Sequence, residues 1–214
     1  MKDALHSMRR NTLRLAAFTA VTAAVLAAMV AWTRAPIEAQ QQRAQLAALA
    51  ALLPVDGFDN DPVADRIEVL APEGLGGTQP QTIHRARRGG QAVAAVLGVT
   101  ADDGYSGPIQ LLLGVGVDGR VIGVRVVAHR ETPGLGDPIE VERSDWIHRF
   151  AGRRIGDPPA ERWAVRRDGG DFDQFAGATI TPRAVVNAVR RALTWFGDNQ
   201  ALVFAAQNPS PPED

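Results

Sequence analysis

The chain has 214 residues, a formal net charge of −1 and no cysteine, and its length accommodates one membrane anchor and one domain of ordinary size. The small net charge argues against a nucleic-acid partner, which would require a strong basic excess on the folded domain. The absence of cysteine excludes disulfides, thiol catalysis and Cys-ligated iron–sulfur clusters, and the scattered histidines lack metal-ligand spacing, so any redox role must rest on an organic cofactor.

The first predicted element is a membrane-spanning helix at residues 15–33, which follows a cytoplasmic N-terminus at residues 1–14. Leu15 to Trp32 is apolar apart from two threonines, and a helix of this length reaches roughly 27 Å, close to the hydrocarbon thickness of a bilayer. Four basic residues precede the run and only Arg34 follows closely, so the positive-inside rule leaves the N-terminus in the cytoplasm. A cleaved signal peptide is the alternative, but the run is long for one and ends in Trp32-Thr33-Arg34, a poor cleavage site.

Beyond the anchor, residues 34–54 predict a stalk helix, because they are rich in Ala, Gln and Leu, place leucines at near-helical spacing and end at a proline. The soluble domain is expected to span residues 55–206. Its first strand is expected around Ile67 to Leu70. Residues 207–214 are rich in proline and are expected to form a disordered tail.

The next predicted elements are β-strands. Ala92 to Val99 reads as a strand, and the cluster Gly104 to Pro108 that follows it reads as a tight turn or loop. Ile109 to Val117 and Arg120 to Ala128 are two β-branched runs joined at Asp118-Gly119, which predicts a two-residue type I′ hairpin turn. The sequence therefore predicts an antiparallel sheet.

Two helices are expected after the strands. Ser144 is suited to cap a short helix that holds Trp146 and Phe150. Pro182 to Phe196 places its apolar residues on one face, with Thr181 as a suitable N-cap. Strands followed by helices indicate an α+β fold, here an N-terminal transmembrane helix followed by one soluble domain with an antiparallel sheet and flanking helices.

The run Gly114 to Gly119 matches the dinucleotide fingerprint G-x-G-x-x-G, but its context argues against that function. The fingerprint must open a helix whose N-terminus meets a pyrophosphate, whereas the residues from Arg120 onward read as another strand. The glycines are expected instead to permit a bulge or the close approach of another group to the sheet.

A first candidate for chemistry is the segment from Asp173 to Thr179, which leads into the last predicted helix. It places the Thr179 hydroxyl between small residues at the positive end of the helix dipole, where an anionic phosphate is favoured. Gly177 and Ala178 keep the backbone accessible, and Arg183 in the first helical turn offers a charge-assisted bond to a phosphate oxygen. The alternative is a plain helix start with a redundant cap.

A second candidate is the segment from His129 to Gly136, where a strand ends in a Pro-Gly turn that frees backbone N–H groups for a ligand. His129 and Glu131 lie two residues apart, so on a strand they share one face. That face either lines a pocket or meets water.

These segments resemble the motifs of a known family. Asp173-x-x-Ala-Gly-Ala-Thr179 is similar to the flavinylation motif Asp-x-x-Ser/Thr-Gly-Ala-Thr of FMN-binding-domain proteins in Rnf-type electron transport complexes and Na⁺-translocating NADH:quinone reductases, with Ala176 where Ser or Thr is commoner. His129 to Gly136 resembles the family's Glu-Thr-Pro-Gly-Leu-Gly segment, and Gly104 to Pro108 its Gly-Tyr-x-Gly-Pro segment. With the anchor, the likeness extends over most of the chain and is greatest to the G subunits of Rnf-type complexes.

The resemblance implies FMN bonded covalently to Thr179 through a phosphoester bond formed by a flavin transferase. It implies an electron-relay subunit, rather than an enzyme alone, of a complex that couples electron transfer between ferredoxin and NAD to ion movement. The expected location is the bacterial inner membrane, single-pass, with the C-terminal domain in the periplasm and the other Rnf-type subunits and membrane lipid as partners. The residues expected around the attachment point are Asp173, Ala176, Gly177, Ala178, Thr181 and Arg183. Those expected to meet or cover the flavin are Glu131, Thr132, Gly134, Leu135 and Tyr105.

Two other functions remain open from the sequence. One is a membrane-anchored extracytoplasmic binding module without a cofactor, in which the hairpin and the Pro-Gly turn hold a protein or peptide. The other is a flavin reductase that binds its flavin noncovalently. Retention or release of flavin on denaturation distinguishes the three.

Overall fold

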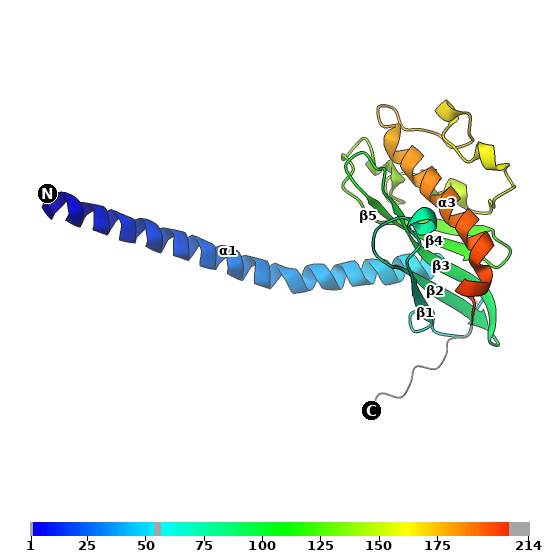
Figure 1. Cartoon of the computed structure of the whole chain (residues 1–214), viewed down its shortest axis with the longest axis horizontal. Helices are drawn as coiled ribbons and strands as arrows, with labels where there is room; N and C mark the ends of the chain where they lie inside the picture. The colour runs from blue at the N-terminus through cyan, green and yellow to red at the C-terminus, as the bar shows by residue number, and fades with distance from the viewer. Residues whose placement is uncertain (1, 54–56, 206–214) are drawn as a thin grey trace. The chain divides into compact units, whose positions relative to one another are not determined.

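The computed structural model, which describes residues 2–53 and 57–205, begins with one long helix, α1 (Lys2–Ala51) (Figure 1). Within it, Leu15–Arg34 has a mean hydropathy of 2.1 and no buried residue, so it is long and apolar enough to cross a membrane. The Thr19 and Thr22 hydroxyls donate to helix carbonyls four residues earlier, each at 2.9 Å, which satisfies them without water. The expected tail at residues 207–214 lies outside the described residues.

The soluble part is built on a five-stranded sheet whose strands follow one another in chain order, each antiparallel to the next. The prediction of an antiparallel sheet is therefore confirmed. The second strand was not expected, because its sequence, QTIHRARR, shows little apolar alternation. The strands are β1 (Arg66–Val69), β2 (Gln81–Arg88), β3 (Gln91–Ala101), β4 (Ile109–Gly116) and β5 (Val121–Ala128).

One face of the sheet is covered by the long C-terminal helix α3 (Ile180–Val203), which lies across the strands in Figure 1. Its apolar residues Val185, Val189 and Phe196 are fully buried in one core cluster with residues of β3 and β4. Together with the sheet, α3 confirms the α+β fold class. The short elements are α2 (Pro72–Leu75) and the 3₁₀ helices η1 (Asp137–Ile139), η2 (Asp145–Phe150), η3 (Ala160–Arg162) and η4 (Arg166–Asp168).

The other face of the sheet carries a second, smaller core cluster formed with the chain just before residue 54. Leu49, Leu52 and Leu53 are buried there against Ala94 and Val96 of β3. The chain divides into two units, Met1–Leu46 and Ala47–Asp214, so these leucines belong to the soluble unit. The expected domain boundary at residues 54 and 55 therefore differs from the boundary in packing, which lies eight residues earlier.

Two glycines of the sheet make room for Leu52. A Cβ on Gly114 would lie 2.5 Å from the Leu52 carbonyl oxygen, and one on Gly123 would lie 2.9 Å from Leu52 Cδ2. The pairing of β4 with β5 also shifts register between Gly114 and Val115. Both parts of the interpretation of the Gly114 to Gly119 run, close approach and a bulge, are thus confirmed, and the run leads into a strand rather than a helix.

We expect Gly114→Ala to lower the free energy of unfolding by about 1–3 kcal/mol, because the Leu52 backbone or the sheet must shift to admit the methyl group. The matched control is Gly197→Ala in α3, where a Cβ meets nothing within 4 Å. It should raise stability by about 0.5–1 kcal/mol, since alanine is the better helix former. Urea unfolding of the full chain in detergent, followed by tryptophan fluorescence, measures both, and equal effects would contradict the prediction.

The turn between β4 and β5 differs from the predicted type I′ turn. The N–H of Gly116 donates to the Arg120 carbonyl at 2.9 Å, so the loop holds three residues, Val117, Asp118 and Gly119, rather than two. Gly119 has a φ of +77° and takes the left-handed position that closes such loops. The prediction of a two-residue turn was wrong because Asp118-Gly119 suits both loop lengths.

The segment between β5 and α3 has little regular structure and is held by aromatic packing. Ser144 caps η2 as predicted, its oxygen accepting from the Trp146 N–H at 3.2 Å. Phe150 stacks on Phe172 with ring centroids 4.6 Å apart, and Trp146 packs edge-on to Phe175 at 5.2 Å. These contacts fix the chain on both sides of Asp173, just before the start of α3.

Candidate functional site

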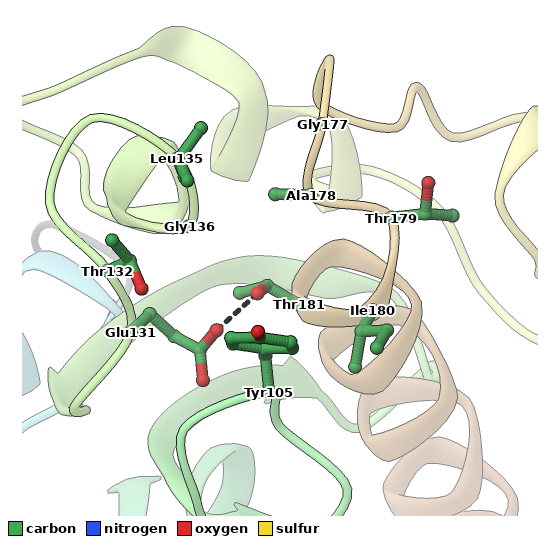
Figure 2. A pocket seen from close by; sticks show the side chains of 10 residues that line it. All are labelled: Tyr105, Glu131, Thr132, Leu135, Gly136, Gly177, Ala178, Thr179, Ile180 and Thr181. Carbon is green, nitrogen blue, oxygen red and sulfur yellow. Dashed lines mark hydrogen bonds between the residues drawn. The ribbon is translucent and has the colours of Figure 1, made fainter.

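Three segments far apart in the sequence line one hollow of about 200 Å³ (Figure 2). They are the loop after β3, the segment after β5 and the start of α3, the same three that carry the family motifs. Most of the residues expected at the site are therefore brought together. The lining residues are Tyr105, Glu131, Thr132, Leu135, Gly136, Gly177, Ala178, Thr179, Ile180 and Thr181.

Glu131 connects the three segments from within the wall of the hollow. Its side chain is only 5% exposed. Oε1 accepts from the Ser106 backbone N–H at 2.9 Å, and Oε2 accepts from the Thr181 hydroxyl, the contact drawn as a dashed line in Figure 2. One carboxylate thus holds the loop after β3 and the first turn of α3 against the segment after β5.

Glycines give this carboxylate its space. A Cβ on Gly136 would lie 2.8 Å from Glu131 Cβ and 3.0 Å from its Oε2. A Cβ on Gly104 would lie 2.2 Å from the Gly107 carbonyl oxygen and 3.1 Å from Glu131 Oε1. Two glycines of the family motifs are therefore required by packing around Glu131.

Thr181 is not the N-cap of α3, contrary to the prediction. The helix begins at Ile180, with Thr179 at the N-cap position and no side-chain hydrogen bond to the first turn. Thr181 is the second residue of the helix. Its side chain is buried, and its hydroxyl donates a hydrogen bond to Glu131. Either threonine suits a cap by residue type, so the contact with Glu131 decides between them.

Thr179 lies at the other end of the hollow from the Glu131–Thr181 pair (Figure 2). Its side chain is half-buried, and its hydroxyl makes no hydrogen bond with any residue that the structure describes. The chain reaches it through a turn in which the Ala178 N–H donates to the Phe175 carbonyl at 3.2 Å and Gly177 has a φ of +79°. A glycine at this third turn position is what a type II turn requires.

The start of α3 gives the surroundings of Thr179 a positive potential. The first N–H groups of a helix have no intrahelical acceptor, and the aligned peptide dipoles place roughly half a positive charge at this end. The helix runs for 24 residues, so its dipole is fully developed. An anionic phosphate near this end of the helix would be favoured by this potential.

Four expected site residues lie outside the lining of the hollow, and Asp173 and Ala176 are the two in the segment before Thr179. The Asp173 carboxylate forms ion pairs with Arg149 at 3.1 Å and Arg166 at 2.8 Å, and its carbonyl accepts from Trp146 Nε1 at 2.8 Å. Asp173 therefore anchors the beginning of the Thr179 segment. Ala176, which departs from the family motif, is exposed at the tip of the turn.

Arg183 and Gly134 also lie outside the lining. Both guanidinium nitrogens of Arg183 that face Asp168 donate to its carboxylate, at 2.6 and 2.9 Å. These hydrogen bonds hold the pKa of Asp168 below its usual value and raise that of Arg183. The pair therefore contributes to stability at neutral pH and loses that contribution as the pH falls through the pKa of the folded state. Gly134, with a φ of +77°, donates to Asp137 Oδ1 at 2.6 Å in the adjoining turn.

The rim of the hollow is apolar and exposed. Tyr105 is 68%, Leu135 46% and Ile180 44% exposed, unusually high values for large apolar side chains that share one hollow. Sequence reasoning named Tyr105 and Leu135 but missed Ile180 and Gly136. Ile180 could have been found from the sequence, because it is a large apolar residue directly after Thr179, in the first turn of the helix.

Among the described residues, no group of three His, Cys, Asp or Glu side chains gathers as a set of metal ligands. The hollow instead combines an apolar rim, one buried acceptor and a helix N-terminus. This donor set suits an organic ring that carries a phosphate.

Comparison with known proteins agrees with this geometry. Residues 104–194 match the family model described as the FMN-binding domain, which contains all three lining segments, and residues 1–52 match the model described as the RnfG N-terminal region. The chain is 49% identical over 201 residues to the G subunit of the ion-translocating oxidoreductase complex of Pseudomonas aeruginosa strain UCBPP-PA14, with 94% of each chain covered. It is 44% identical over 199 residues to the protein of that name from Pseudoalteromonas atlantica, with 93% of each covered. For that of Yersinia pestis the identity is 46% over 192 residues, covering 90% of this chain and 91% of the relative.

Proposed function

The chain belongs to the family of G subunits of ion-translocating oxidoreductase complexes, and we propose that it relays electrons there through FMN bonded covalently to Thr179 by a phosphoester. When bound, FMN supplies one- and two-electron redox chemistry that no protein side chain offers. The single observation that carries the covalent linkage is the Thr179 hydroxyl, which has no hydrogen-bond partner among the described residues and lies at the N-terminus of α3 on the edge of the hollow.

The residues of the hollow fit the two ends of FMN. The backbone N–H groups of Ile180 and Thr181, in the first turn of α3, would favour the negative charge of the phosphate. Tyr105, Leu135 and Ile180 would cover the faces of the ring, and their exposure in the hollow supports this role. Arg183 stays with Asp168 and leaves the phosphate to the helix N-terminus.

Attachment requires that a second protein, a flavin transferase, reach the Thr179 oxygen. The turn before Thr179 favours this, because Ala176 and Gly177 are exposed and carry no large side chain. The ion pairs of Asp173 with Arg149 and Arg166 hold the base of this segment, so its tip is presented from a fixed position. A transferase that contacts Ala176 and Gly177 would meet backbone and small side chains at these two positions.

In the same proposal, α1 anchors the chain in the bacterial inner membrane with Leu15–Arg34 in the bilayer and the flavin domain in the periplasm. The basic residues before Leu15 support this orientation. Covalent attachment then keeps the cofactor on a domain that has no cytoplasmic flavin pool beside it. The other subunits of the complex donate and accept the electrons, and membrane lipid surrounds the anchor.

The proposal is tested with the full chain co-expressed with a flavin transferase and separated on a denaturing gel under ultraviolet light. We expect flavin fluorescence that stays with the polypeptide. Trypsin releases Asp168 to Arg183 as one peptide with two threonines, and fragmentation should place the FMN mass on Thr179. Chain made without the transferase is the control and should be colourless.

Three results would contradict the proposal. Flavin that leaves the chain on denaturation would indicate noncovalent binding and favour a reductase. A colourless band from the co-expressed chain would favour a binding module without a cofactor. An FMN mass on Thr181 would move the attachment point by two residues.

A further inference from the structure

Glu131 is the only charged side chain that lines the hollow among the described residues, and its carboxylate is almost fully buried. Both of its oxygens accept hydrogen bonds, from the Ser106 N–H and from the Thr181 hydroxyl. An ionised carboxylate only accepts hydrogen bonds, so this pattern of two donors suits the charged form. The hollow therefore has a fixed negative charge in its wall.

No cation among the described residues pairs with this charge. The two donors to Glu131 are neutral. Nearby, His129 Nε2 hydrogen-bonds to Glu140 at 2.6 Å and Arg143 forms an ion pair with Asp137, so both of these side chains contact other carboxylates. Asp137, the other buried acid of this segment, is different, because Arg143 Nε lies 3.5 Å from its Oδ2. No side-chain cation in the described part of the chain therefore neutralises Glu131. Its two hydrogen bonds and the N-terminus of α3 offset its charge only in part, and water is largely excluded from its surroundings.

We propose that the Glu131 carboxylate sets the reduction potential of the flavin, an inference that rests on the proposed function. A negative charge in a poorly solvated wall disfavours the addition of electrons to a neighbouring ring, just as it disfavours ionisation of a neighbouring acid. Glu131 therefore lowers the potential of the subunit. Thr181 moderates this effect, because its hydroxyl donates to the carboxylate and offsets part of its charge.

A purely structural role makes a different prediction. Glu131 joins three segments, so its loss by truncation would loosen the hollow whatever the charge does. Glu131→Gln keeps the size of the side chain and an acceptor for the Ser106 N–H. It removes the charge and replaces the second oxygen with an NH₂ group, from which the Thr181 hydroxyl can accept a hydrogen bond instead of donating one. The reduction potential distinguishes the two roles. If Glu131 only holds the three segments together, its replacement lowers the stability of the hollow and gives no reason for the flavin potential to rise rather than fall.

The test is a potentiometric titration of the flavinylated full chain in detergent, followed by the visible absorbance of the flavin. Glu131→Gln should raise the midpoint, with the equilibrium constant for reduction increased about tenfold, which is about 30 mV for a two-electron couple. Thr181→Val should lower it, because the carboxylate loses a donor. Asp137→Asn, a matched loss of a buried acid that Arg143 already compensates, should leave it unchanged.

Each arm has an outcome that overturns the inference. The inference is wrong if the midpoint potential of Glu131→Gln is equal to or below that of the native chain. It is also wrong if Asp137→Asn raises the midpoint potential as much as Glu131→Gln. If Glu131→Gln takes up no flavin, Thr181→Val decides, and an unchanged or raised midpoint there overturns it. Gel fluorescence of the native chain is measured first: its absence defeats the proposed function and this inference together, whereas bound flavin with an unmoved midpoint defeats the inference alone.

Discussion

Replacing Thr179 with valine is expected to leave the chain folded and to abolish all covalently bound flavin. The phosphoester needs the hydroxyl oxygen, and valine has the same shape without it. The fold should tolerate the change, because the hydroxyl makes no hydrogen bond to the described protein and the side chain is half-buried at the N-cap position. We expect a change in the free energy of unfolding within about 0.5 kcal/mol. Gel fluorescence measures the first effect and urea unfolding the second.

Two variants show whether the loss is specific to this oxygen. Thr179→Ser keeps a hydroxyl at the same place and should keep the fluorescent band. Thr181→Val removes the other hydroxyl of the same tryptic peptide and should keep it too, because that oxygen is buried and committed to Glu131. Fluorescence in Thr179→Val, or its loss in Thr181→Val alone, would contradict the assignment of Thr179.

Much of the fold was predictable because its sequence signals are local. Ile109 to Val117 and Arg120 to Ala128 correspond to β4 and β5, and the apolar stripe of the last helix faces the sheet as its spacing indicated. The three motif segments were also recognisable one by one. What the sequence alone did not provide was their convergence on one hollow, because this depends on how the irregular segment after β5 folds back to α3.

The missed features depend on partners distant in the sequence. β2 went unrecognised because Arg85, at the centre of the strand, reads as a surface residue, yet it is 1% exposed. The predicted N-cap of α3 was two residues too late, because the Thr181 hydroxyl donates to Glu131, fifty positions earlier in the sequence, instead of capping the helix. Leu52 was assigned to a stalk, although its burial depends on the glycines of β4 and β5 that admit it. In each case a local preference was overridden by a tertiary contact.

Arg85 also leads to the prediction with the largest effect on stability. Its guanidinium donates to Asp65 Oδ1 from Nε at 2.7 Å and to the Ala205 carbonyl from a terminal nitrogen at 2.9 Å, so one buried cation joins the segment before β1 to the end of α3. Asp65→Asn removes the charge that compensates it. A buried cation without its counter-charge costs about 3–5 kcal/mol, and we expect the free energy of unfolding to fall by about that amount.

The matched control for Asp65→Asn is an aspartate whose arginine is on the surface. Asp118 forms an exposed ion pair with Arg120 at 3.6 Å, and Asp118→Asn keeps an acceptor for the Arg120 N–H, so its effect should stay within about 0.5 kcal/mol. Urea unfolding of the full chain in detergent, followed by tryptophan fluorescence, to which the buried Trp163 contributes, compares the two. If both variants lose a similar free energy of unfolding, the burial of Arg85 does not strengthen its interaction with Asp65. A large loss in Asp65→Asn alone would mean that the buried pair of Arg85 and Asp65 holds the end of α3, the helix that begins at the hollow, against β2.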